Sequence, residues 1–290
     1  MPLKEHFLEL LRRAATDLPP DVEKALRTAR DAEPEGTRGR SALDTILENT
    51  AMAREGSTPL CQDTGTLILY IDYPENGSER VLREAALEAA AEATKRAYLR
   101  PNAVDPVSGK NSGNNIGVNH PFMHFHQWDR PETRVRVILK GGGCENVGAQ
   151  YRLPDMSIGA GRDLKGVRRC IIDAVLKAQG YGCAPGILGV GVGGDRTASY
   201  LLSKEVFFRR LGERNASEPL AALEAELEES LNTLNIGPMG FGGKTTTLGV
   251  FIGAQHRHPA SFFVSVSYMC WAFRRKTMFL DPQGEATYED

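Results

Sequence analysis

Apolar positions that recur every three to four residues predict that the chain begins with helices. Residues 3–17 carry apolar side chains at this spacing, and in residues 19–33 a proline stands at the entrance of a second helix. A third helical stretch covers residues 41–55, and a longer one covers residues 78–99, whose first residue is a serine that can cap the helix. We therefore expect a helical lead-in over about residues 1–56.

Short apolar or alternating runs predict strands in the rest of the chain. Residues 66–73 form an apolar run, while residues 122–128 and 134–140 alternate with period two and are expected to be neighbouring strands. The later segments are predicted, in chain order, as a helix over 164–179, a strand over 186–192, helices near 195–210 and over 218–234, strands over 247–253 and 261–269, and a polar tail. Helices that flank strands in this mixed order indicate an α/β to α+β fold: a mixed sheet with flanking helices and glycine-rich loops, in a single domain over residues 1–290.

Composition narrows the classes of partner. Lysine and arginine number 35 against 37 aspartate and glutamate, so the net charge is 35 − 37 = −2, and no basic excess points to nucleic acid. The N-terminus lacks the continuous apolar stretch of a signal peptide, and no apolar run approaches the roughly 18 residues of a membrane helix. We therefore expect a cytoplasmic protein that contacts neither membrane nor nucleic acid.

Four glycine-rich or polar loops follow apolar segments, over residues 60–66, 140–148, 189–196 and 235–247. The last contains "GPMGFGGKTTT", which is close to a P-loop, but Pro238 stands where the first glycine must be and has no N–H to offer a phosphate. The third matches G-x-G-x-x-G, although its glycines lie inside the strand-like run instead of after it. A nucleotide-binding protein that uses these loops is the alternative from a different class.

The five cysteines divide into two groups by their surroundings. Cys170 lies on the apolar face of a predicted helix, and Cys144 lies in a glycine turn. Cys61, Cys183 and Cys270 each stand at the end of a predicted strand. No C-x-x-C occurs, so zinc-ribbon and ferredoxin spacings are excluded. From the residues alone, the strand-end cysteines are either a three-ligand metal site or buried thiols.

Taken together, seven stretches resemble a known family, the alpha subunit or N-terminal catalytic domain of class I iron–sulfur hydro-lyases. Its members are class I fumarase and L(+)-tartrate dehydratase. The resemblance spans about residues 40 to 275 in the order of the family. The stretches are "LCQDTG", "YLRPNAV", "GKNSGNN", "KGGGCEN", "CAPGILGVGVGGDR", "NIGPMGFGGKTTTLGV" and "HRHPASFFVSVSYMCW".

The resemblance implies a 4Fe–4S cluster held by three cysteines, which leaves one iron open to act as a Lewis acid. It also implies residues that bind the substrate and residues with a catalytic part. In this sequence the implied cluster ligands are Cys61, Cys183 and Cys270, the implied substrate-binding residues are Gln62, Arg100 and Gly143, and the implied catalytic residues are Asp63 and His258. From the residues alone, Asp63 is equally a turn cap and Arg100 a surface ion pair.

The activity implied is a lyase reaction, the reversible hydration of fumarate to L-malate. The family also implies a separate beta-type subunit that carries the catalytic base, a small dicarboxylate substrate and an oligomer of alpha–beta pairs. The chain departs from the family pattern at two positions. Cys183 is followed by Ala184 where the family often has proline, and Cys144 stands where many fumarases have serine. The stretches "KGGG-x-EN" and "GPMGFGGKTT" look closer to fumarase, which we expect, and the alpha subunit of L(+)-tartrate dehydratase is the alternative.

Overall fold

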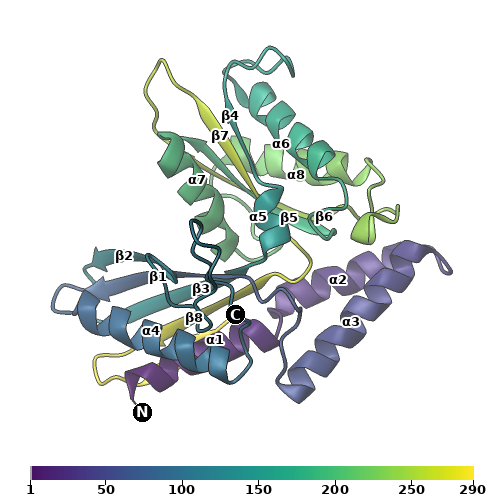
Figure 1. Ribbon diagram of the computed structural model, residues 1–290. Helices are drawn as coiled ribbons and strands as arrows, with labels where there is room; N and C mark the ends of the chain where they lie inside the picture. The colour runs from purple at the N-terminus through teal and green to yellow at the C-terminus, as the bar shows by residue number, and fades with distance from the viewer. Residues whose placement is uncertain (1) are drawn as a thin grey trace. The chain divides into compact units, whose positions relative to one another are not determined.

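The computed structural model describes residues 2–290 and divides into two compact units, each assembled from separated parts of the chain (Figure 1). The first unit contains the residues up to Pro20 together with Glu48–Gly142 and Ala272–Asp290, and the second contains Asp21–Leu47 and Gly143–Trp271. Each unit has its own sheet and its own apolar core. That residues 1–290 act as a single catalytic domain stays a prediction.

The leading helices are the amphipathic elements that the apolar spacing predicts. They are α1 (Leu3–Thr16), α2 (Pro20–Ala32) and α3 (Arg38–Gly56). In α1 the apolar face, with Phe7, Leu10 and Leu11 at 0% exposure, is buried in the core of the first unit. Pro20 begins α2, where its missing N–H costs no helical hydrogen bond. Among residues 2–290, no helix is both long enough and apolar enough to cross a membrane.

The first unit is a five-stranded sheet with helices on one face. Its strands are β1 (Thr66–Pro74), β2 (Phe122–Trp128), β3 (Thr133–Lys140), β8 (Arg274–Leu280) and β9 (Ala286–Glu289), in the order β2-β1-β3-β8-β9. Helix α4 (Glu79–Lys95) packs beside α1, and alternate residues of β1 and β3 complete the core beneath them (Figure 1). The serine predicted to cap α4, Ser78, accepts the N–H of Val81 at 3.4 Å. The helix ends earlier than predicted because Ala97 has a φ of +61°, outside the helical region.

The prediction that residues 122–128 and 134–140 are neighbouring strands is wrong, because β1 lies between β2 and β3. β1 runs parallel to β2 and antiparallel to β3. It is buried along most of its length, whereas β2 alternates between exposed and half-buried positions. A strand that is apolar on both faces is most stable inside a sheet, and one with polar, exposed positions is tolerated at the edge.

The predicted polar tail is also wrong, because residues 274–280 form β8, an inner strand, and β9 follows it. The cations of β8 are buried and have partners: Arg274 donates to the carbonyl of Asp63, and Lys276 pairs with Asp290. Met278 joins the apolar core of the first unit. The charged residues therefore concealed the strand in the sequence, because a buried cation with a partner cannot be told from a solvated one by residue type.

The second unit is a four-stranded sheet with helices on both faces (Figure 1). Its strands are β4 (Ala149–Arg152), β5 (Gly186–Gly193), β6 (Thr247–Gln255) and β7 (Phe263–Met269), in the order β4-β7-β5-β6. Helix α7 (Arg196–Glu205) packs on one face, and α6 (Leu164–Ala178) and α8 (Glu218–Asn232) pack on the other. Short helical turns complete the elements: α5 (Gly142–Asn146) and the 3₁₀ turns Val206–Phe208 and Pro238–Gly240. Both sheets mix parallel and antiparallel pairs, so the expected α+β class is confirmed.

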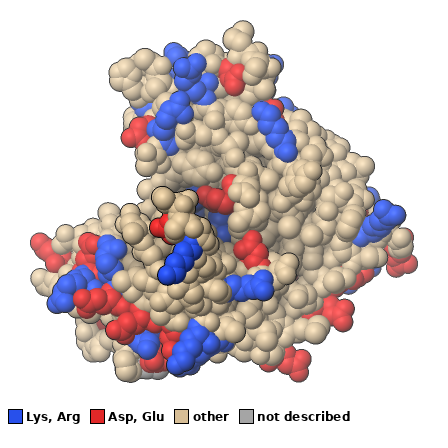
Figure 2. Space-filling model, viewed as in Figure 1, with Lys and Arg blue, Asp and Glu red and all other residues tan. Residues whose placement is uncertain are grey.

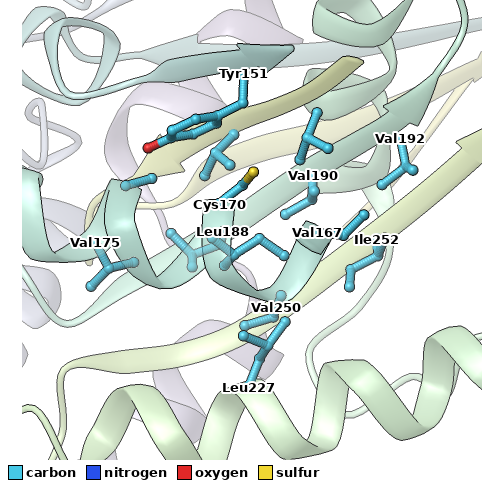
Figure 3. Packing of buried hydrophobic residues seen from close by; sticks show 14 of the residues in the cluster. Tyr151, Val167, Cys170, Val175, Leu188, Val190, Val192, Leu227, Val250 and Ile252 are labelled. Atoms are coloured by element: carbon cyan, nitrogen blue, oxygen red, sulfur yellow. The ribbon is translucent and has the colours of Figure 1, made fainter. Parts of the chain in front are cut away.

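The core of the second unit contains one of the five cysteines. Figure 3 shows Cys170 on α6 among Val167, Leu188 and Val190. Its exposure is 0%, and burial raises the pKa of its thiol to about 12. At neutral pH the thiol is protonated and unreactive, so Cys170 is the core residue that its place on the apolar helix face predicts.

Charged side chains of both signs are interspersed on the face seen in Figure 2. Elsewhere along the helices, charged side chains one turn apart form ion pairs, such as Glu79 with Arg83 at 2.6 Å and Glu92 with Arg96 at 2.7 Å. Exposed pairs of this kind add little to stability.

Candidate functional site

The first unit places four of the predicted site residues on or beside one loop. We call residues 60–65 the Cys61 loop; it connects α3 to β1. Two side chains fix its backbone: Asn49 donates to the carbonyl of Leu60 at 2.9 Å, and Arg274 donates to the carbonyl of Asp63 at 2.7 Å. Gly65 ends the loop with a φ of +82°, and a Cβ there would lie 2.8 Å from the backbone of β3. The loop therefore lies against the end of β3 in a fixed conformation.

Asp63 uses both carboxylate oxygens to fix local backbone. Oδ1 accepts the N–H of Gly65 at 3.0 Å, which is the turn cap considered from the sequence, and Oδ2 accepts the N–H of Gly142 at 2.8 Å. The side chain is nevertheless exposed. Asp63 thus connects the Cys61 loop to the first residue of α5, next to the predicted substrate-binding glycine.

Arg100 lies directly beside the same loop. Its backbone N–H donates to the hydroxyl of buried Thr64 at 2.9 Å, and its guanidinium Nη1 donates to the carbonyl of Gln62 at 3.4 Å. Buried Asn115 holds it from the other side by donating to the carbonyl of Arg100 at 2.7 Å. Within residues 2–290 no carboxylate forms an ion pair with Arg100, so the surface salt bridge considered from the sequence is not present. An exposed guanidinium fixed in this way presents donors to an external anion.

The second unit brings two of the predicted cluster ligands onto adjacent segments. We call residues 180–186 the Cys183 loop; it connects α6 to β5. The N–H of Trp271, the residue after Cys270, donates to the carbonyl of Cys183 at 3.3 Å. Cys183 itself has a φ of +56°, and its N–H donates to the carbonyl of Gly180 at 3.1 Å. A non-glycine residue in this left-handed region is uncommon and marks a position held by its surroundings.

Tyr268, which the sequence reasoning missed, lies under the Cys183 loop. It is 3% exposed, and a Cβ at Gly182 or Gly186 would overlap its ring. Burial, and then the nearby cysteines Cys144, Cys270 and Cys183, raise the pKa of the phenol far above its ordinary value, so it stays neutral. The signal in the sequence was a tyrosine two residues before Cys270, together with glycines on both sides of Cys183. Neither is specific without the fold.

Gly143 and His258 occupy different surroundings in the second unit. Gly143 is exposed near the start of α5, and a Cβ there would lie an ordinary 3.6 Å from the carbonyl of Tyr181, so packing does not require glycine at this position. His258 is exposed on the loop between β6 and β7, and its Nδ1 accepts the N–H of Ala260 at 3.1 Å. The neutral ring therefore carries its proton on Nε2, which is a donor toward solvent.

The strand register does not bring His258 to Cys183 and Cys270 within the second unit. Ile187 at the start of β5 pairs with Met269, next to Cys270, whereas Gly193 at the end of β5 pairs with Gln255. The His258 loop follows that end of β6. β5 has eight residues, so the two sites are about 25 Å apart at roughly 3.3 Å per residue.

The residues that could hold a metal are the thiols, all five of which are present as thiols in the structure. Among the described residues, 2–290, no three His, Cys, Asp or Glu side chains form a group that could hold a metal ion. Cys61 and Cys183 are half-buried and Cys270 is 8% exposed. Thiolates are the donors that iron–sulfur clusters require, and the joined segments of Cys183 and Cys270 supply two of them.

The donors that a nucleotide phosphate would need in the glycine loop, residues 237–247, are already engaged. The N–H of Gly243 donates to Asn235 Oδ1, those of Lys244 and Thr245 to Glu33 Oε1, and those of Thr246 and Thr247 to Asn232 Oδ1, all at 2.7–2.9 Å. A P-loop leaves such groups open for the phosphates. This arrangement argues against the nucleotide-binding alternative.

The G-x-G-x-x-G match has a packing explanation. A Cβ on Gly189 or Gly191 would overlap the carbonyl oxygens of Ser203 and Ser199, so these glycines let α7 pack closely on β5. The first turn of α7 is capped by its own Asp195, whose Oδ1 accepts the N–H of Ala198 at 2.7 Å. The helix N-terminus that would face a pyrophosphate in a dinucleotide site is therefore occupied by a side chain.

Comparison with known proteins agrees with the motifs. Residues 4–279 match the model of the family described as fumarate hydratase (Fumerase). The chain is 49% identical over 283 residues to "Putative fumarate hydratase class I" of Geobacillus stearothermophilus. This aligned region is 97% of this chain and 55% of that protein. The chain is 35% identical over 280 residues to "Putative L(+)-tartrate dehydratase subunit alpha" of Methanocaldococcus jannaschii, covering 95% of this chain and 96% of that one. It is 31% identical over 285 residues to the L(+)-tartrate dehydratase subunit alpha of Escherichia coli, covering 95% and 89%.

These matches, with the α+β fold and the cysteine-bearing loops, place the chain in a family whose named members are hydro-lyases or their subunits. The chain belongs to the fumarate hydratase (Fumerase) family, so the resemblance read from the motifs is confirmed. Class I fumarate hydratases are iron–sulfur-dependent enzymes. The chain spans about half the length of the Geobacillus relative and most of the length of the two tartrate dehydratase alpha subunits.

Proposed function

We propose that this chain is the cluster-carrying part of an iron–sulfur hydro-lyase that hydrates fumarate to L-malate reversibly, together with a separate beta-type subunit. The observation that carries this proposal is the 49% identity to a named class I fumarate hydratase along 97% of the chain. The alternative substrate is L(+)-tartrate. It is supported by the two relatives named for the alpha subunit of L(+)-tartrate dehydratase, which are 35% and 31% identical to this chain.

The proposed cofactor is a 4Fe–4S cluster with Cys61, Cys183 and Cys270 as its ligands. Cys183 and Cys270 lie on segments of the second unit that the Trp271–Cys183 hydrogen bond joins. When bound, such a cluster supplies an open iron position, a Lewis acid for the substrate hydroxyl and one carboxylate.

The residues of the first unit hold and orient the dicarboxylate. Arg100, without an ion-pair partner among residues 2–290, donates two N–H groups to a substrate carboxylate. Gln62 is exposed next to it and donates its side-chain amide. Asp63 fixes the backbone at Gly142 through its carboxylate. Gly143, the next residue along the chain, is proposed to contact the substrate. Water contributes hydroxide to one carbon of the double bond and a proton to the other, and the group that moves this proton is proposed to lie on the beta-type subunit.

A second copy of the chain is proposed to supply His258. One copy of the second unit carries His258 about 25 Å from Cys183 and Cys270. If His258 donates its Nε2 proton to the substrate of a cluster site, that site belongs to another copy, in an oligomer of alpha–beta pairs.

Activity of the assembled, cluster-loaded complex tests the substrate and Arg100. We expect malate to form from fumarate faster than tartrate is dehydrated. Arg100→Met should lower kcat/KM by about 10²-fold, because a positioned donor of the reaction is lost. Arg96→Met is the matched control, since Arg96 is an exposed arginine immediately after α4 that pairs with Glu92 of that helix. Faster turnover of tartrate would select the alternative substrate, and full activity of Arg100→Met would refute the carboxylate clamp.

Mixed oligomers test the role of His258. Chains with His258→Ala and chains with Cys270→Ser are each expected to be inactive with the beta-type subunit. If His258 acts across copies, mixing them before assembly restores activity, because the His258→Ala chain keeps a cluster and the Cys270→Ser chain keeps a histidine. A mixture no more active than its two components contradicts the second-copy assignment.

A further inference from the structure

A buried carboxylate fills the glycine loop of the second unit. Glu33, immediately after α2, is 2% exposed, and its Oε1 accepts the N–H groups of Lys244 at 2.7 Å and Thr245 at 2.9 Å. Gly243 makes room for it, because a Cβ there would lie 2.8 Å from both carboxylate oxygens. The carboxylate thus takes the position of an anion in a phosphate-binding loop.

The same loop is bonded to the backbone on the C-terminal side of Cys183. The N–H of Met239 donates to the carbonyl of Ala184 at 2.7 Å, and the N–H of Gly186 donates to the carbonyl of Thr246 at 3.0 Å. The hydroxyl of Thr247 donates to the carbonyl of Gly186 at 2.9 Å. The Cys-Ala-Pro-Gly segment, with Cys183 at a φ of +56°, is therefore fixed by the glycine loop at two points.

The position of Glu33 is itself fixed from the helical segment. Arg40, in the first turn of α3, donates Nη1 to the carbonyl of Glu33 at 3.1 Å and to that of Arg30 at 3.2 Å. These carbonyls lie at the end of α2, where the regular helical hydrogen bonds stop, and that of Arg30 also accepts the N–H of Glu33 at 3.2 Å. The connection between α2 and α3 therefore holds the carboxylate in one place.

We propose that Glu33 is a positioning residue for Cys183: its carboxylate fixes the glycine loop, and the loop holds the Cys183 backbone in its left-handed conformation. That Cys183 is thereby held ready to bind a cluster rests on the proposed function. That Glu33 controls the conformation of the Cys183 backbone does not rest on it, because the hydrogen bonds involved all lie within the second unit.

The test measures the alkylation rate of each cysteine in the metal-free full chain by mass spectrometry of its peptides. Glu33→Ala removes the acceptor of two N–H groups, and we expect Cys183 to react about tenfold faster or more, since its loop then opens more often. Glu33→Gln keeps Oε1 as acceptor, and we expect a rate within about threefold of the wild type. The rate of Cys61, in the other unit, should not change in either variant.

Glu224 is the matched control. It is also a buried carboxylate of the second unit, 6% exposed, and it accepts a backbone N–H from Ile252 at 2.7 Å, but it does not contact the glycine loop. Glu224→Ala should leave the alkylation rate of Cys183 unchanged. The two alanine variants are compared under conditions in which their free energies of unfolding are equal. An equal acceleration in Glu33→Ala and Glu224→Ala, or none in Glu33→Ala, would overturn the proposal.

If Glu33→Ala does not fold, Glu33→Asp replaces it. Aspartate is one methylene shorter and falls short of the two N–H groups, so Cys183 should react faster than in Glu33→Gln; equal rates would contradict the positioning role. Iron and sulfide binding by the same variants separates the two proposals. Acceleration of Cys183 in a chain that never binds a cluster would refute the proposed function and leave the positioning role standing.

Discussion

The Cys61 loop and the Cys183 loop present their residues in opposite ways. The Cys61 loop presents polar side chains to solvent, because Gln62, Asp63 and neighbouring Arg100 are all exposed. Buried Arg274 and half-buried Asn49 hold its backbone by donating to its carbonyls. Around Cys183 most nearby side chains are small or buried, and Tyr181 is the exception at 79% exposure. There the loop is bonded to glycine-rich backbone, which is fixed in turn by acceptors.

The anchoring groups also differ in chemical sense. In the first unit a guanidinium and an amide donate to carbonyls of the Cys61 loop. In the second unit a carboxylate and two asparagine oxygens accept from N–H groups of the glycine loop, which in turn is bonded to the Cys183 loop. An exposed loop with polar side chains suits recognition of a dicarboxylate. A loop of fixed backbone with a half-buried thiol suits a metal cluster, since ligands that cannot move hold a cluster in one geometry.

The largest effects are expected from the two cores. Phe7 and Leu227 are each 0% exposed, one in each core. Phe7→Ala should lower the free energy of unfolding by about 3–5 kcal/mol and Leu227→Ala by about 2–5 kcal/mol, measured by denaturant titration. Hydrogen exchange should show lost protection mainly in the unit that carries the change. Equal loss of protection in both units would mean that the cores unfold together.

The next effect concerns the glycines of β5. Gly191→Ala should lower stability by about 1–3 kcal/mol or more, because the new methyl group overlaps the carbonyl of Ser199 on α7. Gly161→Ala is the control in the same unit, since a Cβ there meets only ordinary contacts with Asp163. Thermal unfolding compares the two. A Gly191→Ala variant as stable as Gly161→Ala would undo the packing explanation of the G-x-G-x-x-G match.

Arg274→Met tests the anchor of the Cys61 loop and mirrors the change at Glu33. The carbonyl of Asp63 loses a donor from a charged group, which is worth about 1.5–3 kcal/mol. We expect faster alkylation of Cys61 with the rate of Cys183 unchanged, whereas Glu33→Ala should do the reverse. Acceleration of both cysteines by either change would show that the loops are not anchored independently.

The smallest effect is a pH dependence in α1. The hydrogen bond from Arg12, followed by that from Arg13, lowers the pKa of Glu9 below its ordinary value. A lowered carboxyl pKa adds stability above the unfolded pKa, and this is lost as pH falls through the folded pKa. Glu9→Gln should therefore be slightly less stable than wild type at pH 7 and equal to it in strong acid. A difference that persists unchanged at low pH would point to packing instead of charge.

Local patterns predicted most elements because helix spacing and apolar runs are decided by neighbours in sequence. The position of β1 between β2 and β3 and the buried cations of β8 were missed because they depend on pairing across the sheet. The site shows the same division. Gln62 and Asp63 could be predicted to lie near Cys61 because they follow it directly in the sequence. Glu33 contacts Lys244, which is more than two hundred residues away, and no pattern in one sequence indicates that contact.

Iron and sulfide content of single cysteine variants tests the central claim most directly. Each chain is reconstituted without oxygen and its iron and sulfide are counted, with Cys144→Ser and Cys170→Ala as controls for a thiol near the site and a thiol in the core. The account predicts that Cys61→Ser, Cys183→Ser and Cys270→Ser each lose the cluster while both controls keep about four irons per chain. Loss of the cluster in Cys144→Ser, together with its retention in Cys61→Ser, would contradict the account.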